Sequence, residues 1–186
     1  MKLYIKNIVN LLGEEQVKEE LKKLKIHFGL IDSGMVELFD HLDPKKHNKL
    51  KINLITHGLK LQDAGKVILV EKIKRSIEEM IRYTDGMPIK SYSLYLSMGL
   101  HYDYTYLSNI FSEVNGFSIQ QHIIESKIER VKELFQSSDL SLSEISYLLH
   151  YSSVAHLSSQ FKKTTGLSPS CYKLIMHQEE DSFETN

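Results

Sequence analysis

Two short groups of side chains, about 50 residues apart, are of types that can read the edges of nucleic-acid bases. The groups are Thr105, Ser108 and Asn109, and then Val154, Ala155, His156 and Ser159. Asparagine can form two hydrogen bonds with adenine, histidine can donate to or accept from a base edge, and small apolar side chains can contact the methyl group of thymine. Neither group contains arginine. The two groups therefore predict a DNA site that favours A·T base pairs.

Cations in the same half of the chain are candidates for contacts with the phosphate backbone. They are Arg130, Lys162, Lys163 and Lys173. The free backbone N–H groups at the N-termini of the two helices that carry the base-reading side chains would add further phosphate contacts. Residues 66–186 nevertheless hold 12 Lys and Arg against 15 Asp and Glu, so the positive charge must be local. We expect modest affinity that depends strongly on salt.

The elements that must position these side chains are two copies of one helical hairpin. Residues 96–102 recur as 145–151, residues 107–111 as 157–161, and residues 116–118 as 166–168. Each copy predicts a short helix, a tight turn through a histidine and a second helix. The second copy has Lys162 and Lys163 where the first has Ser112 and Glu113. We therefore expect the first copy to hold DNA less tightly.

Residues 66–176 as a whole predict an all-α domain of about seven helices. A single helix from Ser118 to Phe135 joins the two hairpins, and its 18 residues span about 27 Å. With the hairpins added, the second helices come near one turn of duplex DNA, about 34 Å. A monomer is then expected to place both second helices in successive major grooves on one side of double-stranded DNA.

These motifs together resemble the DNA-binding domain of the AraC/XylS family of bacterial transcriptional regulators. The resemblance rests on Ile145-Ser146, Tyr151-Ser152-Ser153, Leu157-Ser158-Ser159-Gln160-Phe161-Lys162-Lys163, Gly166-Leu167-Ser168-Pro169 and the helix segment from Lys127 to Leu134. It implies a double helix-turn-helix over residues 66–176 and a regulator rather than an enzyme. The sequence departs from the family at the turns, where His101 and His150 stand in place of the usual glycine.

The first 65 residues predict a different, α+β domain. The pattern is a strand at 2–9, a helix at 13–24, strands at 26–31 and 35–39, a helix opened by Asp43-Pro44, and a strand at 59–61. This βαββαβ order predicts a ferredoxin-like unit. The unit resembles a heavy-metal-associated domain, whose two cysteines would fall at Asn10 and Gly13. Because both thiolates are missing, we predict no metal and no cofactor, and expect a structural or dimerising role.

Composition limits the remaining possibilities. No apolar run approaches the roughly 20 residues of a membrane span, and the N-terminus does not resemble a signal peptide. Cys171 is the only cysteine, which excludes an internal disulfide, and we expect its thiol to be packed. These features predict a cytoplasmic protein with an acidic tail at 177–186. No glycine-rich phosphate loop or catalytic triad motif is present.

Two alternatives remain open at this stage. The near-neutral charge is compatible with a protein-interaction module in which the helical domain has lost DNA binding. The resemblance of the N-terminal domain is compatible with a metal-responsive regulator.

Overall fold

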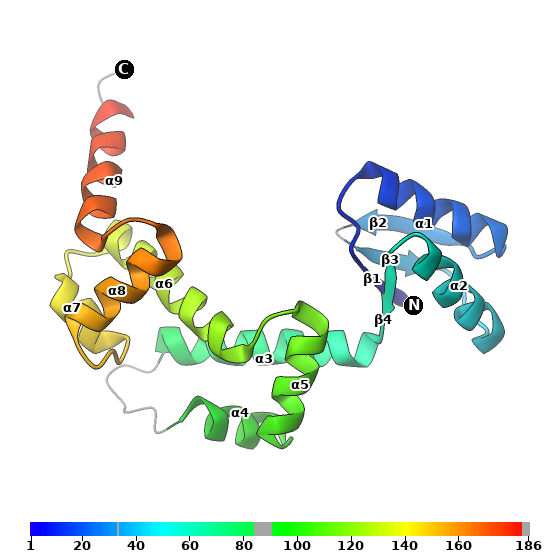
Figure 1. Cartoon of the computed structure of the whole chain (residues 1–186), viewed down its shortest axis with the longest axis horizontal. Helices are drawn as coiled ribbons and strands as arrows, with labels where there is room; N and C mark the ends of the chain where they lie inside the picture. The colour runs from blue at the N-terminus through cyan, green and yellow to red at the C-terminus, as the bar shows by residue number, and fades with distance from the viewer. Residues whose placement is uncertain (33, 84–90, 184–186) are drawn as a thin grey trace. The chain divides into compact units, whose positions relative to one another are not determined.

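The N-terminal unit is a four-stranded antiparallel sheet with two helices (Figure 1). A computed structural model describes residues 1–32, 34–83 and 91–183 of the chain, with side chains described as far as residue 176. The strands are β1 (Lys2–Lys6), β2 (Phe28–Asp32), β3 (Met35–Leu38) and β4 (Lys60–Gln62), and the helices are α1 (Leu11–Lys23) and α2 (Pro44–Thr56). The strand order β2-β3-β1-β4 places β1 beside β3 and β4, so the predicted βαββαβ, ferredoxin-like topology is confirmed.

The core of this unit lies between one face of the sheet and both helices. Alternate strand residues point inward, with Leu3 paired with Val36 and Ile5 paired with Leu61 in the register. They pack in one buried cluster with Val17 and Leu21 of α1 and Leu50 and Leu54 of α2. Burial of these aliphatic side chains is the main stabilising contribution to the unit.

The first strand is shorter than the sequence pattern predicts. It ends at Lys6 rather than Val9, because Asn7 adopts a left-handed backbone with φ of 74° that cannot continue a strand. The Asn7 side-chain amide donates to the Gly58 carbonyl oxygen at 3.1 Å, which holds the chain in this turn. Asn10 then caps α1 by accepting a hydrogen bond from the Gly13 N–H at 3.1 Å.

The remaining described helices confirm the predicted all-α half of the chain. They are α3 (Ala64–Tyr83), α4 (Tyr92–Leu100), α5 (Tyr104–Asn115), α6 (Ile119–Ser137), α7 (Leu142–Leu148), α8 (Val154–Thr165) and α9 (Pro169–Phe183). The chain divides into two compact units, Met1–Glu71 and Lys72–Asn186, and α3 begins in the first and continues into the second. The sequence Asp85-Gly86-Met87-Pro88 predicts the end of α3, and these four residues lie outside the described ranges. None of the helices in the described ranges is long and apolar enough to cross a membrane.

Candidate nucleic-acid interface

Two hairpins of similar construction, α4 with α5 and α7 with α8, form the candidate interface (Figure 1). Each hairpin has one fully buried residue in its first helix and two in its second helix, at corresponding positions. These residues are Leu96, Leu107 and Phe111 in one copy, and Ile145, Leu157 and Phe161 in the other, all with no exposed surface. Since the same positions are buried in both copies, the same faces of α5 and α8 are left for solvent.

The helix ends also repeat. Asp103 caps α5 and Ser153 caps α8, each by accepting hydrogen bonds from backbone N–H groups of the first turn. Gly116 and Gly166 end the two helices in left-handed conformations, with φ of 88° and 82°. These caps fix where each reading helix begins and ends.

The tight turns use histidine in a conformation that glycine favours. His101 has φ of 59° and His150 has φ of 54°. In the second hairpin the N–H of Tyr151 donates to the Ser146 carbonyl and that of His150 to the Tyr147 carbonyl, which is the Schellman arrangement. A side chain at the left-handed position costs about 1 kcal/mol relative to glycine.

The predicted base-reading residues lie on the outer faces of α5 and α8. Thr105, Asn109, Val154, Ala155, His156 and Ser159 are exposed, and Ser108 is half-buried. The structure thus gathers each group on one helix face. Their contacts with bases stay a prediction.

His156 is oriented by two neighbours. Its Nδ1 lies 3.0 Å from the Ser152 hydroxyl, and the Tyr151 ring packs edge-on against the imidazole with 5.4 Å between ring centroids. Because Nδ1 is used within the turn, Nε2 is the ring nitrogen that remains for a base edge.

Tyr106 is a candidate reader that sequence reasoning missed. It is the counterpart of His156 in the first hairpin, it is 46% exposed, and its ring stacks on Tyr102 with 5.3 Å between centroids. In each hairpin the tyrosine of the turn therefore packs against the ring at the third position of the second helix. These pairs are Tyr102 with Tyr106 and Tyr151 with His156. The repeat itself is the signal that identifies Tyr106, because residues 107–111 align with 157–161.

The predicted phosphate-binding cations differ in their surroundings. Lys162 and Lys163 are exposed in the last turn of α8. The Arg130 guanidinium is instead bound to the Glu133 carboxylate at 2.9 Å, and Lys173 is half-buried with its Nζ 5.8 Å from the Phe135 ring centroid. The structure therefore leaves Lys162 and Lys163 as the cations best placed to meet a phosphate.

Lys127 holds the second hairpin against the linker helix α6. Its ammonium group donates to the Leu149 carbonyl oxygen at 2.7 Å and lies 4.9 Å from the Tyr151 ring centroid and 5.6 Å from that of Tyr92. Burial lowers the pKa of Lys127 to about 8 and raises the pKa of Tyr92 and of Tyr151 to about 12. One half-buried cation thus contacts α4 and the end of α7 together.

Two other predictions concern reactive or metal-binding groups. Cys171 is exposed, so the expectation of a packed thiol was wrong: the side chain lies on the outer side of α9. At the positions of the absent metal-site cysteines, Asn10 serves as a helix cap and Gly13 is buried. Within the described part of the chain, no group of three or more His, Cys, Asp or Glu residues is arranged to hold a metal ion.

Comparison with known proteins identifies the class of the second unit. Residues 96–174 match the model of a helix-turn-helix domain family. These residues therefore form a helix-turn-helix domain, and relatives that are similar to the chain include proteins named as transcriptional regulators.

Individual relatives are similar over parts of the chain. The MmsAB operon regulatory protein of Pseudomonas aeruginosa is 33% identical over 70 residues, which is 38% of this chain and 23% of that protein. The uncharacterized HTH-type transcriptional regulator YijO of Escherichia coli is 24% identical over 123 residues, 66% of this chain and 41% of its own length. The chain therefore spans less than half the length of either relative.

A solved structure agrees in fold. The C-terminal domain of AraT, a response regulator from Geobacillus stearothermophilus, aligns with a TM-score of 0.50 at 22% identity, covering 57% of this chain and 84% of that one. At this identity the likeness supports the double helix-turn-helix fold alone.

Proposed function

We propose that this chain regulates transcription by binding specific DNA sequences, with α5 and α8 inserted into successive major grooves. The observation that carries the proposal is the pair of equivalent outer faces on α5 and α8. These two helices have caps and buried residues at corresponding positions. The linker helix α6 has 19 residues, about 28 Å of helix, which suits two readers one DNA turn apart.

The chemistry of the exposed side chains supports an A·T-leaning site. Asn109 can pair bidentately with adenine, Val154 and Ala155 can contact thymine methyl groups, and His156 can present Nε2 to a base. Tyr106 offers a ring edge and a hydroxyl at the equivalent place on α5. Lys162, Lys163 and the N-terminal amides of both helices supply contacts to phosphates.

The experiment is a titration of the whole chain against random duplex DNA at low and moderate salt, followed by selection of bound sequences from a random pool. We expect binding that weakens steeply with salt and a selected consensus rich in A·T pairs. Absence of binding below about 10 μM at low salt would contradict the proposal and favour a protein-interaction module.

The role of the N-terminal unit is part of the same proposal. We infer that it is a heavy-metal-associated-like domain without the metal-binding cysteines, and that it joins two copies of the chain in the cytoplasm. Sedimentation of the protein with and without Cu(I) tests this. A dimer whose mass is unchanged by the metal is expected, and a monomer, or a dimer formed only with metal, would contradict it.

A further inference from the structure

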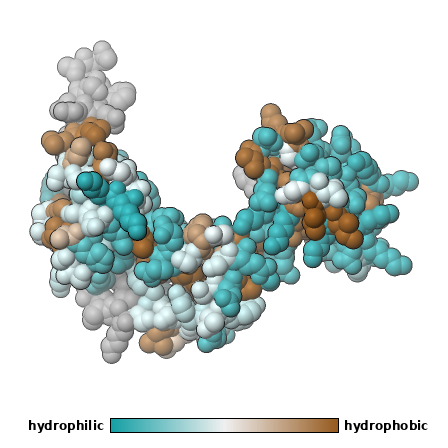
Figure 2. Space-filling view, in the orientation of Figure 1, coloured by the Kyte–Doolittle hydropathy of each residue, from teal (hydrophilic) through white to brown (hydrophobic). Residues whose placement is uncertain are grey.

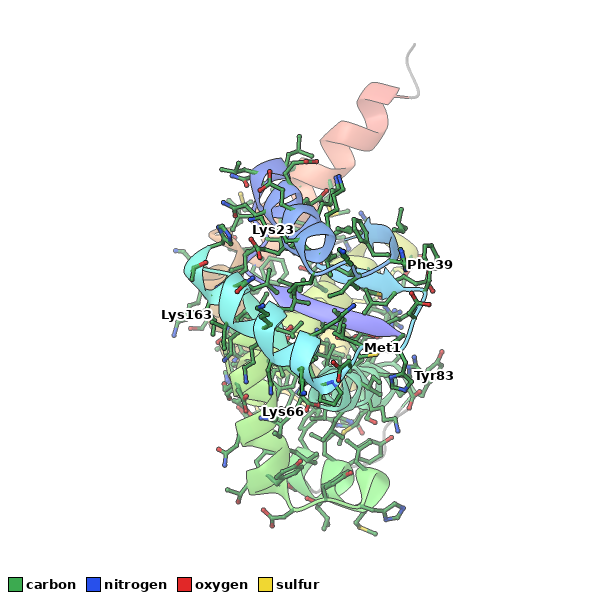
Figure 3. All side chains as sticks on the ribbon, turned by 90° about the vertical axis from the view of Figure 1, so that its right-hand side faces the viewer. Met1, Lys23, Phe39, Lys66, Tyr83 and Lys163 are labelled. Atoms are coloured by element: carbon green, nitrogen blue, oxygen red, sulfur yellow. The ribbon has the colours of Figure 1, made fainter. Side chains whose placement is uncertain are left out.

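A groove lined by lysines lies on the N-terminal unit, where α1 ends and α2 begins. Lys23, Lys25, Lys45, Lys46 and Lys49 line it together with Leu24, and we call these five lysines the lysine groove. All five are exposed. This end of the unit is hydrophilic in Figure 2, and Lys23 is labelled on α1 in Figure 3.

The positive charge of the groove is mostly unbalanced by nearby acids. Among the described side chains, Lys23 is the groove residue with a carboxylate partner, Glu20 at 2.6 Å. Lys46 instead donates to a backbone oxygen, that of Lys25, at 3.4 Å. The contacts described within the protein do not offset this concentration of positive charge. The groove is therefore suited to binding an external anion.

One carboxylate lies beside the groove, at the N-terminus of α2. The Asp43 side chain caps this helix by accepting from the Lys45 N–H at 3.4 Å. A single negative charge offsets only part of the positive charge of Lys45, Lys46 and Lys49, so the groove keeps a net positive charge.

Several cations of the helix-turn-helix domain are already engaged within the protein. Arg82 and Arg130 both bind Glu133, at 2.6 and 2.9 Å, and Lys132 binds Glu129 at 2.7 Å. The exposed Lys162 and Lys163 remain to meet phosphates on that domain. Further cations elsewhere on the chain would add to the affinity, because affinity for duplexes comes largely from cations that neutralise phosphates.

We propose that the lysine groove binds the phosphate backbone of duplex DNA. This inference rests on the proposed function for the identity of the polyanion. Duplex DNA presents one negative charge per about 1.7 Å of its axis, so several phosphates can face an open groove at once. Lysines act as point charges on flexible stems, which suits contacts that are independent of sequence.

The test compares two charge-matched variants of the full chain on a random 60-base-pair duplex. The groove variant is Lys25→Gln, Lys46→Gln and Lys49→Gln. The control variant changes Lys2, Lys51 and Lys60 to Gln, three exposed lysines outside the groove. Fluorescence anisotropy measures the association constant from about 50 to 200 mM KCl.

We expect the groove variant to bind at least about tenfold more weakly and to lose about 2.7 from the slope of log K against log salt, since three phosphate contacts are removed and each contributes about 0.9. The control variant should stay within about threefold of the original protein. Equal slopes in the two variants would overturn the inference. So would loss of binding to phosphatidylserine vesicles in the groove variant with an unchanged DNA slope, because this would assign the groove to membrane lipids.

A selection experiment separates failure of this inference from failure of the proposed function. If the original protein selects a base consensus and the groove variant keeps the salt slope, the groove inference alone fails. If the slope falls as expected but no consensus is selected, the groove binds DNA and the proposed base reading is wrong.

Discussion

The two hairpins have nearly the same architecture and opposite electrostatics. Their fully buried positions, left-handed turns and glycine C-caps correspond. The exposed ends of the reading helices differ: α5 begins at Asp103 and has Glu113 in its last turn, whereas α8 begins at Ser153 and has Lys163 there. The comparison indicates that the buried residues determine the geometry of each hairpin, whereas the exposed residues determine its affinity for DNA.

The cap of α5 adds to this difference. Hydrogen bonds from the Thr105 backbone and side chain, and from the Tyr106 N–H, lower the pKa of the Asp103 carboxyl, so it stays ionised at the end of the helix that would face phosphates. Ser153 caps α8 without a charge. We therefore expect α5 to contribute base reading with little attraction to the backbone, and α8 to contribute both.

The largest effect is expected from removing the two lysines of α8. The Lys162→Gln, Lys163→Gln variant should bind DNA about 100-fold more weakly at 0.1 M salt, and the slope of log K against log salt should fall by about 1.8, because two phosphate contacts are lost. Anisotropy titrations measure both quantities. An unchanged slope would show that these lysines do not meet phosphates.

A smaller loss, specific to sequence, is expected from the ring residues of the readers. Replacing His156 by Ala should reduce discrimination at one base pair about tenfold, within the range of about 1–3 kcal/mol for a good base contact. Tyr106→Ala should do the same one DNA turn away. Binding to single-base variants of the selected site measures this, and a uniform loss across all variants would contradict a base-reading role.

A gain of similar size is expected when the weaker hairpin is given positive charge. Glu113→Lys should strengthen binding to all sequences by about tenfold at 0.1 M salt, because repulsion is replaced by one phosphate contact. Glu37→Lys on the N-terminal sheet is the control for the change in net charge, and it should have a smaller effect. If both variants gain equally, the two hairpins do not differ in the way described.

The Lys127 contact predicts a pH dependence of stability. The folded chain has a Lys127 pKa of about 8, whereas an unfolded chain has the ordinary value of about 10.4. Between these values the unfolded chain holds a proton that the folded chain has released, so the free energy of unfolding should rise with pH through this window. The facing groups Tyr92 and Tyr151, with pKa of about 12, stay protonated there.

Denaturant unfolding from about pH 7.5 to 10 measures this rise against the Lys127→Met variant, which has no amine to titrate. The original protein should gain stability relative to the variant as pH increases. Lys132→Met, at a lysine paired with Glu129 on the same helix, is the control and should leave the rise in place. Parallel curves for the original protein and Lys127→Met would contradict the lowered pKa.

The smallest effect is expected at the left-handed turns. His150→Gly should raise the free energy of unfolding by a few tenths of a kcal/mol to about 1 kcal/mol, because glycine relieves the cost of φ of 54° but loses more entropy on folding. His101→Gly should behave alike, since the turns match. A loss of stability in one variant alone would show that its histidine makes a stabilising contact.

Local features of the fold were predictable from sequence, and contacts between distant residues were not. Caps such as Asp103, Ser141 and Gly166 depend on neighbours within four residues, so their types and spacing predict them. The end of β1 was predicted three residues too late because the left-handed turn at Asn7 depends on a hydrogen bond to Gly58, which is far along the chain.

The candidate site shows the same division. The outward faces of α5 and α8 follow from helical periodicity, which is why the seven predicted readers share two faces. The pairing of Glu133 with Arg130 and with Arg82 joins α6 to α3, and the Lys127 contacts join α6 to α4 and α7. Such pairings depend on tertiary packing, so the sequence alone did not distinguish the engaged cation Arg130 from the exposed Lys162 and Lys163.

Selection of bound duplexes from a random pool tests most directly the claim of two base-reading helices on one spacer. The predicted result is two clusters of specified bases about 10 base pairs apart, one that weakens in the His156→Ala variant and one that weakens in the Tyr106→Ala variant. A single cluster, or two clusters that respond to the same variant, would contradict the account.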